Sequence, residues 1–144
     1  MAGTVRNARP EDFNEVFTLL QQLWQGRELD KVKLQSIFNL SMESESEFVF
    51  CYIENGQVVG FTAGVIQNDY CFAVPLCYVS ALVVDEKQRG GGIGAKLMDY
   101  VKNIACENAC GAVLNLPLGL SVNKRTHFTR NMGLRERLIS SVYS

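Results

Sequence analysis

Four glycines within five positions constrain this chain more than any other feature of its sequence. Gly90, Gly91, Gly92 and Gly94 follow a long uncharged stretch, residues 74–84, and precede apolar residues at helical spacing. Glycine adopts backbone conformations that other residues resist and lets a ligand approach the main chain closely. A helix that begins here presents unpaired N–H groups and the positive end of its dipole. The pattern of strand, turn and helix therefore predicts a phosphate-binding cradle made from backbone.

The rest of the chain reads as a mixed α/β fold in a single domain over residues 1–144, a length typical of one domain. Asn55-Gly56 between two apolar runs is the strongest short signal for a β-hairpin. Periodicity and turn residues predict the order β-α-α-β-β-β-α-β-α-β. The expected strands are 4–9, 48–53, 57–67, 74–84, 112–116 and 134–143, and the expected helices are 10–26, 30–42, 92–108 and 123–132.

Composition excludes several classes of function. A formal net charge of -1 offers no broad basic surface for nucleic acid or an anionic membrane. No apolar run reaches the roughly 18 residues of a membrane span, and the first residues lack the apolar core of a signal peptide, so we expect a cytoplasmic protein. The five cysteines are an odd number and only one histidine, His127, accompanies them. We expect reduced, packed cysteines and no metal site.

Two other phosphate-binding turns compete for this pattern. A nucleotide P-loop needs Gly-Lys-Ser/Thr, whereas this turn continues Gly94-Ala95-Lys96-Leu97 without a hydroxyl for magnesium. A dinucleotide site needs G-x-G-x-x-G/A in an early βαβ unit with an acidic residue about 20 positions later. Counting from Gly90 places Ala95 at the third position, so spacing leaves this alternative open. The expected antiparallel strands before the turn, and the lack of acidic residues in 111–120, count against it.

The third alternative is a resemblance. Arg89-x-x-Gly92-x-Gly94 resembles the Q/R-x-x-G-x-G/A signature of the GNAT superfamily of N-acetyltransferases, which follows the fourth strand of that fold. The resemblance extends over nearly the whole chain. Its weaker matches are residues 5–8 with Asp12, residues 82–85, and residues 128–134, which are similar to the family's F-Y-x-x-x-G-F segment.

The resemblance implies a largely antiparallel mixed sheet, splayed between strands 4 and 5, with about four helices. It also implies acetyl-CoA as the co-substrate, lying in the wedge between those two strands. The backbone of strand 4 would pair with pantetheine, the turn would bind the pyrophosphate, and residues near the C-terminus would contact pantetheine and pack against the cofactor. The residues implied in these roles are Leu82, Val83, Val84, Arg89, Gly90, Gly91, Gly92, Ile93, Gly94, Ala95, Asn123 and Phe128.

The residues expected to move protons depart from the family pattern. Thr129 stands where the family places a tyrosine acid, and Ser80 and Ala81 stand where the fourth strand often carries a carboxylate base. The catalytic residues are therefore left open. Residues on or near the expected substrate cleft that could replace them are Tyr70, Cys71, Cys77, Tyr78 and His127. The acidic segment 41–47 could steer a cationic amine toward the site or simply be a solvated loop.

Two functions follow from these observations. The first is an acetyl-CoA-dependent N-acetyltransferase that acts by direct attack of a primary amine, of a small molecule or of a protein. The second is a non-catalytic acyl-CoA-binding or regulatory module, motivated by the missing tyrosine and carboxylate. The resemblance also allows a homodimer, because many relatives pair.

Overall fold

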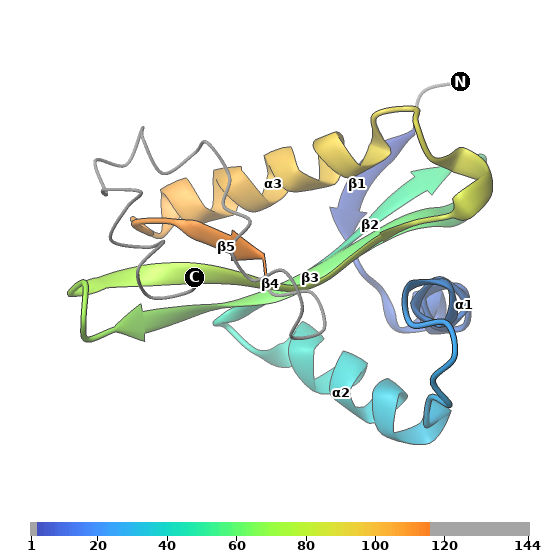
Figure 1. Ribbon diagram of the computed structural model, residues 1–144, viewed down its shortest axis with the longest axis horizontal. Coiled ribbons are helices and arrows are strands. Elements are labelled where there is room, and N and C mark those ends of the chain that lie inside the picture. Colours follow the sequence, from blue (N-terminus) through green and yellow to red (C-terminus); the bar gives the residue numbers. More distant parts are fainter. Residues whose placement is uncertain (1–2, 116–144) are drawn as a thin grey trace.

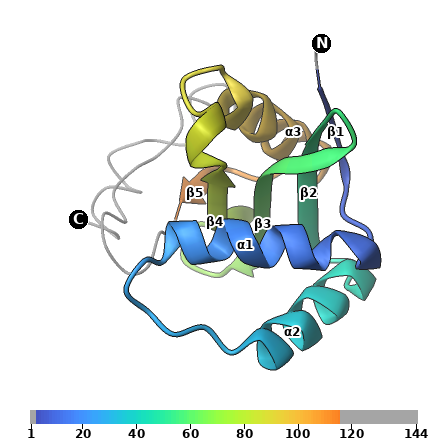
Figure 2. The ribbon, with the colours of Figure 1, turned by 90° about the vertical axis from the view of Figure 1, so that its right-hand side faces the viewer.

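The computed structural model describes residues 3–115 of the chain. Five strands form one sheet in the order β1-β2-β3-β4-β5, antiparallel except for the parallel pair β4–β5. The helix α3 covers one face of the sheet, and α1 and α2 cover the other (Figures 1 and 2). The mixed, largely antiparallel α/β fold expected from the sequence is thereby confirmed. The strands are β1 Thr4–Asn7, β2 Glu47–Glu54, β3 Gln57–Asp69, β4 Val74–Val84 and β5 Val113–Asn115.

The helices agree with the sequence patterns except at some ends. A short 3-10 turn, η1 (Pro10–Asp12), precedes α1 (Phe13–Leu23), so the predicted first helix begins as a tighter turn and stops before Gly26. The second helix, α2, spans Lys31–Glu43, and the Asp30 side chain caps it by accepting from the Lys33 N–H at 3.0 Å. The third, α3, spans Ile93–Glu107. The predicted helix 123–132 and strand 134–143 lie outside the described residues.

The β2–β3 hairpin forms at the predicted Asn-Gly pair. Both Asn55 (φ 53°) and Gly56 (φ 75°) have positive φ, the conformation that a two-residue type I′ turn requires. Asparagine and glycine tolerate this conformation better than other residues, so the turn sets the register of the two strands.

Two apolar cores lie on opposite faces of the sheet. Ile93, Leu97 and Val101 of α3 are buried against Phe48 and Phe50 of β2. On the other face, α1 and α2 bury their own apolar residues against β2, β3 and β4. The main members of that second core are Phe13, Val16, Leu20, Phe38, Val49, Phe61, Ala81 and Val83. The cradle turn thus joins a strand that is packed on both faces to a helix that is firmly anchored.

An ion pair ties the start of the chain to α1. Asp12 is buried and accepts hydrogen bonds from both terminal nitrogens of Arg6, at 2.7 and 3.0 Å, and from the Arg9 N–H at 2.8 Å. This two-point guanidinium–carboxylate geometry is the strong form of such a pair. It fixes β1 against the turn that begins α1.

Among residues 3–115, no helix is both long and apolar enough to cross a membrane. In the same part of the chain, no three side chains of His, Cys, Asp or Glu gather as metal ligands would.

Candidate functional site

The glycine turn has the left-handed backbone conformations that its glycines permit. Gly90 (φ 89°) and Gly92 (φ 83°) both lie in the left-handed region, and Gly92 is the N-cap of α3. A β-carbon at either position would meet no atom within 4 Å, so conformation and not space requires glycine there. A short 3-10 turn, η2 (Glu86–Gln88), follows β4, and the two left-handed residues then lead the chain into the first turn of α3.

The first turn of α3 presents unpaired N–H groups. No side chain caps it, and its first helical hydrogen bond runs from the Lys96 N–H to the Gly92 carbonyl at 3.1 Å. The N–H groups of Ile93, Gly94 and Ala95 consequently have no acceptor within the helix. These N–H groups lie at the positive end of the α3 dipole, so the start of the helix is suited to bind a phosphate group.

Gly94 differs from the two left-handed glycines. It lies inside α3 with no positive φ, and a β-carbon there would meet only Val84 Cγ2, at an ordinary 3.8 Å. Neither the backbone conformation nor the packing therefore requires glycine at this position. Alanine would even stabilise the helix by about 1 kcal/mol relative to glycine. Because Cα–Cβ bonds tilt toward the helix N-terminus, a side chain here would lie over the unpaired N–H groups. The missing side chain leaves room for a ligand at those groups.

Side chains from two directions hold the turn in place. The Arg89 Nε donates to the Val84 carbonyl at 2.9 Å, which closes the turn onto the end of β4. From α1, Gln22 uses both ends of its amide: Nε2 donates to Asp85 Oδ1 at 3.3 Å, and Oε1 accepts from the Glu86 N–H at 3.0 Å. Gln22 thus connects α1 to residues more than 60 positions away, and no signal in the sequence around Gln22 predicts this contact.

β4 carries a bulge just before its final segment. Ala63 pairs with Ala81 but Gly64 pairs with Val79, so Ser80 is an extra residue on β4. An extra residue shifts the alternation of side chains by one. Cys77 and Val79 therefore face α3, whereas Ala81 beyond the bulge faces α1 and α2.

Beyond this bulge, the far edge of β4 has no strand partner among residues 3–115, and this stretch is the open edge of β4. β5 pairs only with Cys77–Val79, so this open edge spans residues 80–84. The Asp85 N–H bonds to the Val59 carbonyl of β3, so the antiparallel alternation turns the backbone groups of Val83 toward β3. The backbone N–H and C=O groups of Leu82 and Val84 point toward the open edge. The Val84 carbonyl already accepts a hydrogen bond from Arg89 Nε.

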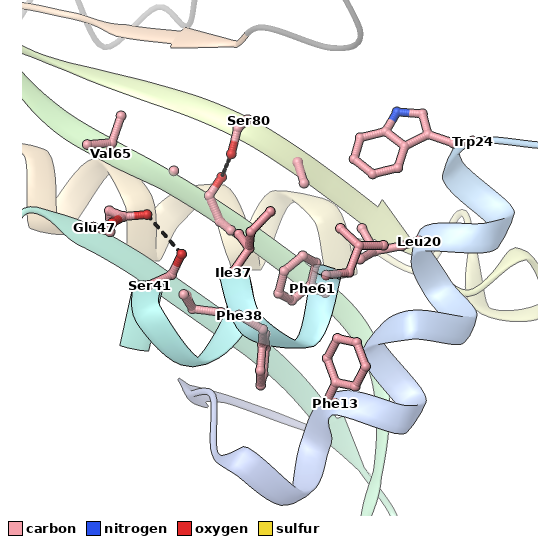
Figure 3. A pocket seen from close by; sticks show the side chains of 15 residues that line it. Phe13, Leu20, Trp24, Ile37, Phe38, Ser41, Glu47, Phe61, Val65 and Ser80 are labelled. Carbon is pink, nitrogen blue, oxygen red and sulfur yellow. Dashed lines mark hydrogen bonds between the residues drawn. The ribbon is translucent and has the colours of Figure 1, made fainter. Parts of the chain in front are cut away.

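A cavity of about 230 Å³ lies between the sheet and the two helices α1 and α2 (Figure 3). Phe13, Phe38 and Phe61 form much of its apolar wall. Ser80, at the bulge, lines one side of it and donates from Oγ to the Ala63 carbonyl at 3.2 Å. The other residues around the cavity are Leu20, Trp24, Leu34, Ile37, Ser41, Glu47, Val49, Ala63, Gly64, Val65 and Ala81. The cavity thus reaches the same bulge from which the open edge of β4 begins.

Polar groups in this cavity are few. Ser41 of α2 donates from Oγ to Glu47 Oε1 at 2.8 Å, and both residues lie at the opposite end of the cavity from Trp24 (Figure 3). The Trp24 Nε1 is buried without a hydrogen-bond partner among the described residues. Glu47 is the one carboxylate among the described residues that line the cavity, and no lysine, arginine or histidine is among them.

Several candidate residues from the sequence lie elsewhere. Tyr70 is 98% exposed in the β3–β4 connection, and Cys71 is exposed beside it; neither lines the cavity. Cys77 is wrong as a cleft residue because it is buried under α3, where burial raises the pKa of its thiol to about 12. Tyr78 packs beside Leu76 in a small cluster that includes β5.

The cysteines are all free, but they are not all packed. Burial raises the pKa of the Cys51 thiol to about 12 and that of the Cys110 thiol to about 11, so both resist reaction at neutral pH. Cys71 and Cys106 are exposed, which corrects the expectation of a fully packed set.

The remaining predicted positions are Asn123, His127, Phe128 and Thr129. All four lie outside the described residues, so their predicted roles stay predictions.

Solved structures of acetyltransferases share this fold. A GNAT family acetyltransferase from Staphylococcus aureus is 18% identical, with a TM-score of 0.69 over 80% of this chain and 86% of that one. Glucosamine-6-phosphate N-acetyltransferase from Arabidopsis thaliana is 16% identical, with a TM-score of 0.70 over 94% and 92%. A ribosomal-protein-alanine N-acetyltransferase from Brucella melitensis is 17% identical, with a TM-score of 0.64 over 80% and 79%.

A comparison with curated protein sequences finds no match. The family model for the acetyltransferase (GNAT) family, however, matches residues 13–134, which is most of the chain. That match includes β4, the glycine turn and α3, the elements that form the candidate site. The chain therefore belongs to the GNAT family of acetyltransferases.

Proposed function

We propose that this protein transfers the acetyl group of acetyl-CoA to a primary amine by direct attack. One observation carries the proposal: the left-handed glycine turn and the uncapped start of α3 lie at the end of the open edge of β4. Backbone N–H groups from Gly90 to Ala95 would bind the pyrophosphate. The outward backbone groups of Leu82, together with the Val84 N–H, would pair with the pantetheine amides.

The residues present fit this co-substrate. Gly94 leaves space over the N–H groups of the helix start, and those groups are donors that suit phosphate oxygens. The Val84 carbonyl is taken by Arg89, so the inferred role of Arg89 is to shape the turn. Val83 differs from its neighbours, because its backbone faces β3 and its side chain is buried under α1 and α2; we infer that it supports the edge without touching pantetheine.

The chemistry needs positioning more than covalent help. A neutral amine attacks the thioester carbonyl, the C–N bond forms, the C–S bond breaks, and the CoA thiolate takes up a proton that the amine releases. Holding the amine in the cavity next to the thioester at the edge of β4 supplies much of the rate, and backbone donors aimed at the developing oxyanion supply more. The cavity beside the bulge at Ser80 is where we infer that the amine enters.

The test is thiol release. Incubation of the protein with acetyl-CoA and a panel of primary amines should release free CoA, which a thiol reagent detects, and should yield the N-acetyl product by mass spectrometry. An acetyl-CoA blank without amine is the control. No release above that blank with any amine would contradict the proposal.

A second function, binding of acyl-CoA without transfer, is favoured by one observation. Ser80 and Ala81 line the cavity at the bulge without an acid or base, and the Ser80 hydroxyl is bonded to the Ala63 carbonyl. This alternative predicts calorimetric binding of CoA together with no thiol release. Turnover of any amine would exclude it.

Gln22 provides a further prediction about the turn. Gln22→Ala removes both hydrogen bonds from α1 to residues 85 and 86, so we expect CoA affinity to fall about tenfold as the turn loosens. Isothermal titration calorimetry measures the change. Gln21→Ala, at the exposed neighbouring position, should leave the affinity unchanged. Equal losses in the two variants would show that Gln22 does not position the turn.

A further inference from the structure

The cavity that we assign to the amine restricts what the amine can be. Its walls are aromatic and aliphatic side chains from α1, α2 and the sheet. A polyhydroxylated acceptor would bury more hydroxyl groups here than the few polar lining residues can pair, which is costly. The volume of about 230 Å³ is also below the roughly 300–1,000 Å³ of pockets that enclose drug-sized ligands. A small molecule with an apolar body fits these walls.

The only charged side chain among the described residues that line the cavity is negative. No basic side chain is among its described lining residues, so residues 3–115 offer a phosphorylated acceptor no counter-charge there. Glu47 contributes a carboxylate, and the adjoining segment 43–47 carries Glu43 and Glu45 with no basic residue. An acceptor with a positive charge complements this end of the cavity.

Glu47 lies too far from the bulge to bind the reacting nitrogen itself. It pairs with Val65 across β2 and β3, and Val65 pairs with Tyr78 across β3 and β4. Two strand spacings of roughly 4.8 Å place the Glu47 backbone about 10 Å from that of β4. One carboxylate oxygen accepts from Ser41 Oγ at 2.8 Å, and a carboxylate has capacity for further donors. Glu47 is therefore placed to bind a second group of the acceptor.

From this arrangement we infer that the acceptor is a diamine whose two nitrogens are separated by an apolar chain or ring. One nitrogen lies at Ser80 beside the open edge of β4, and the other is an ammonium that donates to Glu47. The apolar middle packs against the phenylalanines of the cavity wall. This inference rests on the proposed function, because that function supplies the reason why an amine enters the cavity.

Binding to the CoA-loaded protein tests the inference without requiring turnover. Octane-1,8-diamine and octan-1-amine share one amine and an apolar chain, and they differ in the second nitrogen. Calorimetry should show that the diamine binds about threefold more tightly, as expected for one added ion pair at an exposed carboxylate. Glu47→Gln should remove that preference. Glu45→Gln, on the same segment but outside the cavity lining, should retain it.

Three results would overturn the inference: equal affinities of the two amines in the wild-type protein, an unchanged preference in Glu47→Gln, or tighter binding of glucosamine 6-phosphate than of the diamine. The melting temperature of Glu47→Gln checks its folding, and Ser41→Ala provides a second variant that keeps the carboxylate and should keep the preference. Because the experiment measures binding, its result on the diamine preference does not depend on whether the protein transfers acetyl groups. A lack of acetylation of either amine would count against the proposed transferase function alone.

Discussion

Gly94→Val should lower the affinity of the protein for CoA by more than about 100-fold while the fold persists. The side chain would lie over the unpaired N–H groups of Ile93, Gly94 and Ala95 and exclude a phosphate from them. Charge-assisted hydrogen bonds contribute about 1.5–3 kcal/mol each, so the loss of two corresponds to at least this factor. Calorimetry with CoA measures the affinity, and thermal unfolding checks the fold.

Gly94 is a sharper probe than the glycines beside it. At Gly92 (φ 83°) any side chain strains the backbone, so a loss of binding there would combine strain with steric exclusion. At Gly94 the helix tolerates a side chain, and Gly94→Ala should leave the melting temperature equal or higher. The matched control is Asn103→Val, the same β-branched side chain on the exposed face of α3. Unchanged CoA affinity in Gly94→Val would show that the phosphates bind elsewhere.

Asp12→Asn should destabilise the folded protein by about 2–3 kcal/mol at neutral pH. An amide cannot accept the two charged hydrogen bonds from Arg6, and it leaves that guanidinium without its partner. Breaking a fully buried pair costs about 3–5 kcal/mol, and the 27% exposure of the Arg6 side chain reduces this cost. Urea unfolding measures the difference. Glu11→Gln, at an exposed position beside it, should change stability by less than about 0.5 kcal/mol.

The same pair predicts how stability depends on pH. Burial by itself would raise the pKa of the Asp12 carboxyl, but the hydrogen bonds from Arg6 and from the Arg9 N–H, with the charges of both arginines, hold it below its usual value. The contribution of the pair is therefore present above the unfolded-state pKa of about 3.9, and it is lost as pH falls through the lower folded-state pKa. Asp12→Asn should flatten this acid limb of the stability curve. An acid limb identical to that of the wild type would contradict the assignment.

Local sequence signals predicted the elements that depend on a few neighbouring residues. Asn55-Gly56 indicated the hairpin because the turn demands positive φ at two consecutive residues, and both have it. The uncharged run 74–84 predicted β4 with its observed bounds, and the glycines predicted the start of α3. The GNAT resemblance rested on that same turn, and the family match confirms it.

The faces of β4 could not be predicted in the same way. Alternation along a strand does not say which face carries the substrate, and the bulge at Ser80 reverses the alternation midway. Cys77 was therefore a candidate for the cleft although it is buried under α3. The bulge depends on the register with Ala63 and Gly64 on β3, and nothing in the sequence around Ser80 indicates it.

Local sequence signals predict the glycine turn with the strand and helix that it joins, and the GNAT resemblance implies that Ser80 and Ala81 stand where a carboxylate base is often found. These depend on backbone conformations and side-chain chemistry that lie within a short window of residues. Packing is what brings Gln22 of α1 to the turn, and it places Glu47 and Ser80 of different strands around one largely apolar cavity. Such contacts join residues that are distant in sequence, so they exist only after packing has fixed the register of the strands and the positions of the helices.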